Sequence, residues 1–459
     1  MPDKDTLWIL TEEKPKVSVI SKIIDTYCAD FNDTCCNCSN VKIKPIFEDG
    51  VFKFQYLVEG MTLSMVGDIR ILIVSGSSSF VDFLLFKQKE QPMENGTDVP
   101  IMAIEETKTC DIESRNTGVY QRGTKFVFIR HFYPTVKLYM LYNDENAAGK
   151  MKRPSQTSIF GTNLLLTIGV NIIGKDLKWF NSFSSIDDIL NFKSKMRNPP
   201  NGERIIIAKN DDSISISSRL DKRHCEGKIS HDPNIGALTI LAKCFRDLGW
   251  RGKIVVTNHH IEQRNINTTR AEKNKFLYVC HLLGMTLDGI SLPDTILPSS
   301  YWHYDMSSEK VASILLHVQA EYRGLKEVYQ NHAGCERGYF ICLNDNIITL
   351  PKKDKNGINL YLPDLVMADS ESKNVLLIEG KKLSTLKAGL DEICDYDSIE
   401  NEYIHPQFPG YNVIRGVSIF GGSKDSIPAK GVMFYLNNNG NVFVSDDAPV
   451  CIKQLFKDI

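Results

Sequence analysis

The chain has 459 residues, of which 42% are hydrophobic and 24% are charged, and its formal net charge is −2. These values are typical of an ordinary globular protein with enough chain for about two to four domains. They exclude a surface that is basic all over, so any surface for nucleic acid must be local.

The sequence carries no targeting or membrane signal. Residues 1–14 lack the basic region and apolar core of a signal peptide, and the longest apolar stretch, 164–173, is too short to span a bilayer. We therefore expect a soluble cytoplasmic protein with no membrane contact. Its twelve cysteines should then be reduced thiols. Four of them cluster without the C-x-x-C spacing, and they are either a zinc site or simple thiols: Cys28, Cys35, Cys36 and Cys38.

The first third of the chain predicts one helix and a series of strands. A helix over 17–31 is indicated by Val17, Ile20, Ile24 and Tyr27, which fall on one face at the helical period. Short apolar segments predict strands over 51–58, 71–74, 80–86 and 101–104.

Two of these strands carry charged residues where burial is expected. Asp82 lies in the strand 80–86, and the strand 101–104 runs on into Glu105, Glu106, Thr107 and Lys108. Charged groups are rarely buried without a task. Asp82, Glu106 and Lys108 are therefore a candidate site, followed by a predicted helix over 113–130 and a strand over 136–142.

Polar and basic segments offer candidate contacts to DNA. The segment 106–122 is dense in side chains that can contact phosphates or base edges: Arg115, Asn116, Gln121 and Arg122. A basic loop further on contains Arg219, Lys222 and Arg223, which are either phosphate contacts or a solvated surface.

The middle of the chain predicts an α/β segment of its own. The run Pro-Pro-Asn-Gly at 199–202 marks a turn or linker. Strands are expected over 204–208, 213–217 and 253–257, and a helix begins at Asp232-Pro233 with aspartate as the N-cap. No G-x-G-x-x-G or GK[ST] loop follows a strand here, which argues against a nucleotide-binding enzyme.

The most informative stretch is 361–382, which reads as two strands joined by the polar turn 369–374. Asp364 precedes the first strand, and Glu379 and Lys381 end the second. Paired strands lie about 4.8 Å apart, so the two carboxylates can converge on one cation, and Lys381 points to the same face as Glu379. Two hard oxygen ligands suit Mg²⁺, which would polarise a scissile phosphate and lower the pKa of a bound water.

Helices and strands are expected on both sides of this stretch. A helix over 307–332 precedes it, with strands over 338–343 and 347–350, and a helix from Ser384 and a strand over 411–420 follow. Glu321 falls on the apolar stripe of the first helix. It is either a further metal-site carboxylate or a helix-edge residue paired with a base such as Arg323.

The arrangement Pro363-Asp364 … Glu379-x-Lys381 resembles the PD-(D/E)xK nuclease superfamily, and within it the type II restriction endonucleases. The family core is a helix, three strands, a helix and a further strand, which is the order predicted around 361–382. The resemblance implies metal-dependent phosphodiester hydrolysis, with these three residues as catalytic groups and both carboxylates, joined by Glu321, as Mg²⁺ ligands. The earlier motif repeats the pattern without the proline and implies a second centre, with Asp82 and Glu106 on the metal and Lys108 beside them.

The expected fold is therefore α/β: two restriction-endonuclease-like cores, each a mixed sheet flanked by helices, with a central α/β segment. The expected domains are 1–150 and 301–459 for the two cores and 151–300 for a central DNA-recognition region. The expected function is site-specific, Mg²⁺-dependent cleavage of double-stranded DNA, with one active site for each strand. A cognate DNA methyltransferase would belong to the same system without direct contact. A DNA-binding protein with one decayed nuclease core, and a repair or defence nuclease, remain open alternatives.

Overall fold

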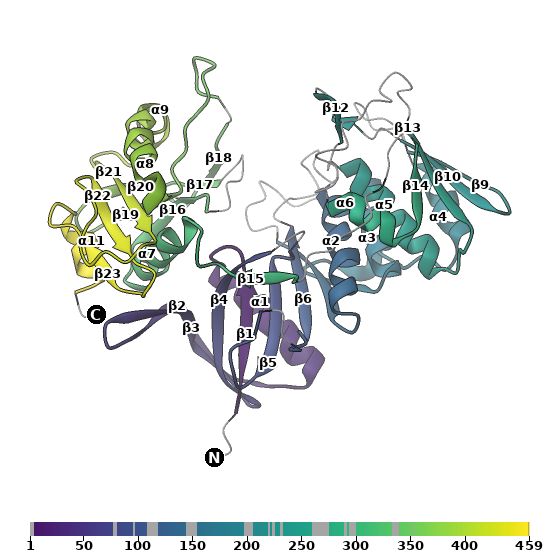
Figure 1. Cartoon of the computed structure of the whole chain (residues 1–459), viewed down its shortest axis with the longest axis horizontal. Coiled ribbons are helices and arrows are strands. Elements are labelled where there is room, and N and C mark those ends of the chain that lie inside the picture. The colour runs from purple at the N-terminus through teal and green to yellow at the C-terminus, as the bar shows by residue number, and fades with distance from the viewer. Residues whose placement is uncertain are drawn as a thin grey trace. The chain divides into compact units, whose positions relative to one another are not determined.

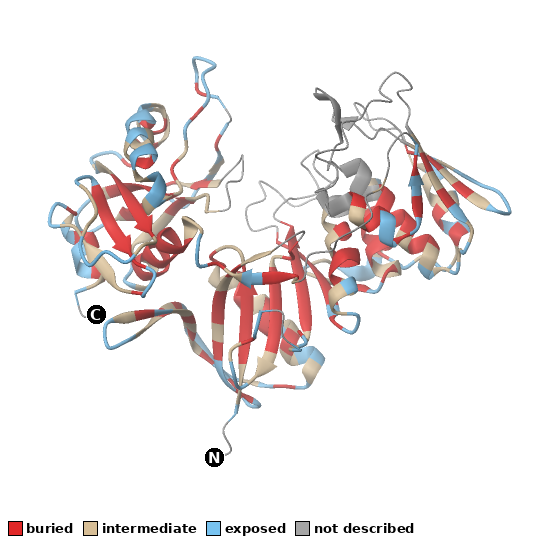
Figure 2. Cartoon of the chain, in the orientation of Figure 1, coloured by how far each residue is buried: buried red, intermediate tan, exposed pale blue. Residues whose placement is uncertain are grey.

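The computed structural model describes residues 4–76, 80–94, 97–107, 118–143, 154–196, 205–218, 221–222, 225–229, 233–258, 275–288, 292, 300–332, 339–351, 353–457 and 459. It is a mixed α/β protein with several mixed sheets flanked by helices (Figure 1). Figure 2 shows that the buried residues concentrate in the strands and in parts of the helices. None of the described helices is long and apolar enough to cross a membrane.

The chain groups into two compact units. Unit 1 contains Met1–Ser75, Lys87–Pro92 and Tyr304–Ile459, and unit 2 contains Gly76–Phe86 and Met93–His303. This grouping cuts across the three consecutive domains predicted from the sequence, because the beginning and the end of the chain belong to the same unit.

The N-terminal part of unit 1 is a sheet with the strand order β2-β3-β4-β1 and one helix, α1 (Val17–Phe31). Ile20, Ile24 and Tyr27 of α1 are buried, as its periodicity predicted, and the helix ends at Asn32 in the left-handed conformation. The strands β2 and β3 form a long antiparallel hairpin, whereas β1 and β4 run parallel. The four strands are β1 (Asp5–Thr11), β2 (Cys35–Glu48), β3 (Val51–Leu63) and β4 (Val66–Gly76).

The C-terminal part of unit 1 is a six-stranded sheet with the order β16-β19-β20-β21-β22-β23. β19 pairs with β16 and β20 antiparallel, and β21 pairs with β20 and β22 parallel. These strands are β16 (Lys326–Gln330), β19 (Leu365–Asp369), β20 (Asn374–Lys382), β21 (Asn412–Phe420), β22 (Val432–Leu436) and β23 (Val442–Val444). A separate hairpin consists of β17 (Tyr339–Ile341) and β18 (Ile347–Thr349).

Helices pack on this C-terminal sheet and cover its apolar residues. One face, with Val366 and Leu377, packs against Tyr396, Ile399 and Phe408 from the helical segment after β20. The helices of this part are α7 (Lys310–Tyr322), α8 (Leu386–Glu392), α9 (Asp397–Ile399), α10 (His405–Gln407) and α11 (Val450–Leu455).

The predicted helix over 307–332 is wrong in its second half. The helix α7 ends at Tyr322, Gly324 follows with a φ of 97°, and β16 begins at Lys326. A glycine in this left-handed conformation ends a helix without steric cost. The predicted apolar stripe ran on to Tyr329, which is fully buried but belongs to the strand β16.

Among the described residues, unit 2 contains two larger sheets and the two-stranded sheet β11-β12. The first has the order β5-β6-β7-β8, with β5 and β6 antiparallel and the other pairs parallel. The second has the order β14-β13-β10-β9. The strands of these sheets are β5 (Phe83–Gln88), β6 (Met102–Thr107), β7 (Lys137–Tyr142), β8 (Val170–Ile173), β9 (Ile206–Lys209), β10 (Ser213–Ser218), β11 (Asp221–Lys222), β12 (Cys225–Ile229), β13 (Lys253–Asn258) and β14 (Met285–Leu287). The short strand β15 (Trp302–Tyr304) lies where the chain passes from unit 2 to unit 1.

The helices of unit 2 pack against one another. Helices α2 and α5 approach closely at Gly123, where a Cβ atom would lie 2.2 Å from Ile240 Cδ1, and Thr124 shares a 2.7 Å hydrogen bond with Thr239. The absence of a side chain at Gly123 is therefore what allows this contact. The helices are α2 (Gly118–Phe132), α3 (Gln156–Thr167), α4 (Ile186–Lys195), α5 (Pro233–Asp247) and α6 (Lys275–Leu282).

Candidate functional site

The C-terminal sheet of unit 1 brings Asp364, Glu379 and Lys381 together, and we call these three residues the carboxylate–lysine centre. Asp364 directly precedes β19, and the other two residues lie in β20. The amide N–H of Gly380 donates to Asp364 Oδ2 at 2.9 Å, so the first carboxylate is fixed against the strand that carries the second.

The lysine and Glu379 are held by further side chains that the sequence analysis did not identify. Lys381 donates to Glu379 and to Glu392 Oε2, the latter at 2.8 Å, and the hydroxyl of Tyr396 donates to the other oxygen of Glu379. Gly389 of α8 leaves room for the lysine stem, because a Cβ there would lie 2.6 Å from Lys381 Cγ. The three charged residues of the centre thus have fixed positions.

Both carboxyl groups of this centre are difficult to ionise. Burial is the main cause that raises the pKa of Asp364 to about 6, and Glu309 and Glu392 raise it further. Burial, followed by the charge of Asp364, raises the pKa of Glu379 to about 8, although Lys381 and Tyr396 stabilise its charged form. Lys381 alone therefore does not offset the cost of placing two negative charges, those of Asp364 and Glu379, in this buried position.

This donor set fits a hard divalent cation. Two buried carboxylates that repel each other are stabilised by a bound cation, and oxygen donors at strand ends suit Mg²⁺, which keeps several waters. Asp364 and Glu379 are the residues that would hold it.

Glu321 does not join this centre. The residue of α7 that faces Gly380 is Ser313, whose Oγ would lie 3.1 Å from a Cβ built there, and Glu321 follows eight residues later, roughly 12 Å along the helix axis. Its carboxylate is paired with Lys14 instead. The acidic residue of α7 that acts on Asp364 is Glu309 at the N-terminal end of the helix.

Unit 2 contains a pair of carboxylates whose strand register matches that of Asp364 and Glu379 in unit 1. Asp82 precedes Phe83, which pairs with Ile104, and Glu105 follows. In unit 1 Asp364 precedes Leu365, which pairs with Ile378, and Glu379 follows.

The backbone hydrogen bonds agree with this register. The N–H of Glu106 donates to Asp82 Oδ2 at 2.6 Å, as that of Gly380 does to Asp364. In this register the residue of β6 that corresponds to Glu379 is Glu105, one residue before the predicted Glu106. Glu106 Oε1 accepts a hydrogen bond from Asn143 at 2.8 Å instead.

Two basic residues of α2 neutralise the carboxylates of unit 2. Glu105 is completely buried and accepts hydrogen bonds from Arg122 at 2.7 Å and from Lys125 at 2.9 Å. Both cations also approach Asp82, at 3.5 and 3.9 Å. Burial raises the pKa of Glu105 to about 7, with a further rise from Asp82, while Lys125 and Arg122 oppose it. Arg122, predicted as a DNA contact, thus pairs with both carboxylates, while 31% of its side chain stays exposed.

Sequence reasoning missed Lys125, although its spacing was informative. Arg122 and Lys125 are three residues apart and therefore share one face of α2. Thr107 occupies the β6 position that corresponds to Lys381, so a lysine from the helix replaces one from the strand.

The remaining predicted site residues lie outside the part of the chain that can be assessed. Lys108, Arg115, Asn116, Arg219 and Arg223 are outside the described residues, and only the backbones of Gln121 and Lys222 are described. Among the described residues, the cysteines that the sequence left open as a zinc site do not gather into a set of metal ligands: Cys28, Cys35, Cys36 and Cys38.

Comparisons with known proteins add no family to this description. No protein-family model matches the chain, and neither the curated proteins nor the solved structures contain a significant match.

Proposed function

We propose that this protein is a Mg²⁺-dependent endonuclease that hydrolyses phosphodiester bonds of double-stranded DNA at the carboxylate–lysine centre. The single observation that carries the proposal is the meeting of Asp364, Glu379 and Lys381 at the ends of two paired strands. The order of α7, β19, β20, α8 and β21 around these residues supports a restriction-endonuclease-like core, as the motif implied.

Each residue of the centre has a chemical role in this proposal. Asp364 and Glu379 would hold the cation, which when bound polarises the scissile phosphate and lowers the pKa of a water ligand. Lys381 keeps its ammonium beside Glu379, where it can orient the attacking water and offset charge on the phosphate. Tyr396 and Glu392 hold Glu379 and Lys381 in place.

The cluster of unit 2 supports a different role. Its two carboxylates face two cations, Arg122 and Lys125, whereas in unit 1 one lysine faces Asp364, Glu379 and Glu392. A charge-compensated cluster has less need of a bound cation. This favours the alternative in which unit 2 is a DNA-binding core that has lost catalysis over the proposal of one active site for each strand.

Nicking assays separate these two alternatives. If each unit cuts one strand, Glu105→Gln should leave a protein that nicks one defined strand, and Glu379→Gln one that nicks the other. If unit 2 is a DNA-binding core only, Glu105→Gln should still make double-strand breaks, and Glu379→Gln should cut neither strand.

The proposed activity is tested by incubating supercoiled plasmid with purified protein in Mg²⁺, in Ca²⁺ and in EDTA. Cutting is expected in Mg²⁺, binding with little cutting in Ca²⁺, and no cutting in EDTA. Discrete fragments would support a site-specific restriction enzyme, which would need a DNA methyltransferase in the same system to protect the host. A smear would support a general repair or defence nuclease, and undiminished cutting in EDTA would refute the mechanism.

A further inference from the structure

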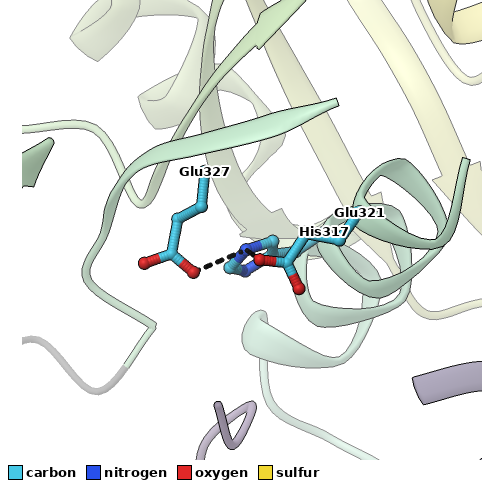
Figure 3. Close-up of side chains that lie close together, drawn as sticks. All are labelled: His317, Glu321 and Glu327. Carbon is cyan, nitrogen blue, oxygen red and sulfur yellow. Dashed lines mark ion pairs between the residues drawn. The ribbon is translucent and has the colours of Figure 1, made fainter. Parts of the chain in front are cut away.

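Unit 1 contains a second group of metal-ligand side chains, which we call the histidine–glutamate cluster: His317 and Glu321 of α7 and Glu327 of β16. His317 and Glu321 are four residues apart and therefore share one helix face. His317 Nε2 lies 3.1 Å from Glu327 Oε2 and 3.7 Å from Glu321 Oε1, and the donor atoms of all three lie within 4.8 Å of one another. Figure 3 shows both carboxylates turned toward the imidazole ring.

The imidazole of His317 is oriented by His332 and Ser313, which lie on the side of its Nδ1 atom. Its Nδ1 lies 3.0 Å from His332 Nε2, and His332 Nδ1 lies 3.1 Å from Ser313 Oγ. The hydroxyl of Ser313 donates its one hydrogen to the carbonyl of Lys310. His332 must therefore donate from Nδ1 to Ser313 and accept at Nε2, so His317 donates from Nδ1.

In the tautomer that donates from Nδ1, His317 would present the lone pair of Nε2 to the carboxylates of Glu321 and Glu327. His317 is completely buried, and its Nε2 makes no hydrogen bond of good geometry, although Glu327 Oε2 lies 3.1 Å away. A lone pair that faces negative oxygens is repelled by them unless a positive ion lies between. A histidine whose second nitrogen is fixed by a hydrogen bond is also the usual form of a metal ligand.

Lys14 supplies the positive charge that the cluster has without a metal. Its side chain is only 2% exposed, and its ammonium pairs with Glu321 and, at 3.3 Å, with Glu327. The ammonium of Lys14 therefore occupies the carboxylate oxygens that a divalent cation would bind, and it competes with that cation for them.

We propose that His317, Glu321 and Glu327 form a second divalent-cation site, selective for a transition metal such as Mn²⁺ or Zn²⁺, with the Lys14 ammonium as its competitor. One imidazole nitrogen with two carboxylate oxygens suits these metals better than Mg²⁺, which prefers oxygen alone. The ligands of this site differ from those of the carboxylate–lysine centre, so the inference stands independently of the proposed function.

Mn²⁺ titration of the full-length protein, followed by pulsed electron paramagnetic resonance, tests this site directly. Nitrogen from an imidazole ligand modulates the signal of bound Mn²⁺, whereas the carboxylate–lysine centre offers no nitrogen ligand from histidine. We expect nitrogen modulation in the wild type and in Glu379→Gln, and its loss in His317→Gln. Circular dichroism of the His317→Gln protein controls for folding.

Removal of Lys14, which competes with the metal, gives a second test, in which Mn²⁺ binding should become tighter rather than weaker. Lys14→Met removes the ammonium, so it should tighten Mn²⁺ binding at the nitrogen-coupled site at least tenfold, and Mn²⁺ should raise the melting temperature of this variant more than that of the wild type. Lys44→Met, at a half-exposed surface pair with Glu59, is the matched control and should change neither value. Absence of nitrogen modulation in the wild type, or unchanged affinity in Lys14→Met, would overturn the proposal. Loss of all Mn²⁺ binding in Glu379→Gln would overturn it too, while leaving the proposed function intact.

Discussion

Raising the pH from about 6 to about 8 should tighten Mg²⁺ binding at the carboxylate–lysine centre by about 100-fold. Without metal, burial raises the pKa of Asp364 to about 6, and burial and the charge of Asp364 raise that of Glu379 to about 8. A cation binds the ionised carboxylates, so across this range it must displace the proton of Glu379. One released proton corresponds to about tenfold in affinity for each pH unit, or ~2.7 kcal/mol over two units.

Isothermal titration calorimetry measures both the affinity and the number of protons released, when it is repeated in buffers of different ionisation enthalpy. About one proton should be released at pH 7, and most of the pH dependence should disappear in Glu379→Gln, in which Asp364 is the only carboxyl of the pair left to titrate. A Kd that does not change with pH, or binding without proton release, would refute this account of the centre.

The same groups set the stability of the metal-free protein. A carboxyl whose pKa is raised in the folded state holds its proton more tightly there than in the unfolded chain. The contribution of Glu379 to the folding stability of the protein should therefore fall as the pH rises from about 4.5, the ordinary pKa of this carboxyl, through about 8. Added Mg²⁺ should raise the melting temperature more at pH 8 than at pH 6.

Three further predictions concern single substitutions. Glu309→Gln should weaken Mg²⁺ binding by less than about tenfold (~1.4 kcal/mol) because it removes charge near Asp364, whereas Glu321→Gln should leave Mg²⁺ affinity unchanged in the same titration. Gly389→Ala should slow plasmid cleavage at least about tenfold, because the new methyl group meets the stem of Lys381, and DNA binding measured by gel shift should persist. Glu105→Gln should change the melting temperature of the protein more than Glu106→Gln, because Glu105 alone is completely buried between two cations, and equal shifts in thermal denaturation would contradict the register that we describe.

The carboxylate–lysine centre could be predicted from the sequence because its parts are close along the chain. Asp364 and Glu379 flank one short hairpin, and strand alternation alone puts Lys381 on the face of Glu379. Nothing from a distant segment is needed to bring these three side chains together.

The centre of unit 2 was harder, because two glutamates stand side by side at the end of β6. The sequence does not fix the register across the long loop between β5 and β6, and a slip of one residue turns every side chain to the other face. Glu105 and Glu106 could therefore not be distinguished, and Lys125 lies on a helix that follows.

Glu321 shows a further limit of prediction from the sequence. Helical periodicity gave the face of α7 on which it lies but not which neighbour it meets there. That neighbour is Lys14, which is remote in sequence and joins the cluster only when the two ends of the chain fold into one unit.

The central claim is that Asp364, Glu379 and Lys381 perform the hydrolysis, and single-turnover cleavage of plasmid DNA by Glu379→Gln tests it most directly. Glu371→Gln, in the exposed turn between the same two strands, is the matched control. We expect Glu379→Gln to bind DNA but to cut at least about 100-fold more slowly than the wild type, ~2.7 kcal/mol in the barrier, and Glu371→Gln to cut at the wild-type rate. Wild-type cutting by Glu379→Gln would contradict the claim.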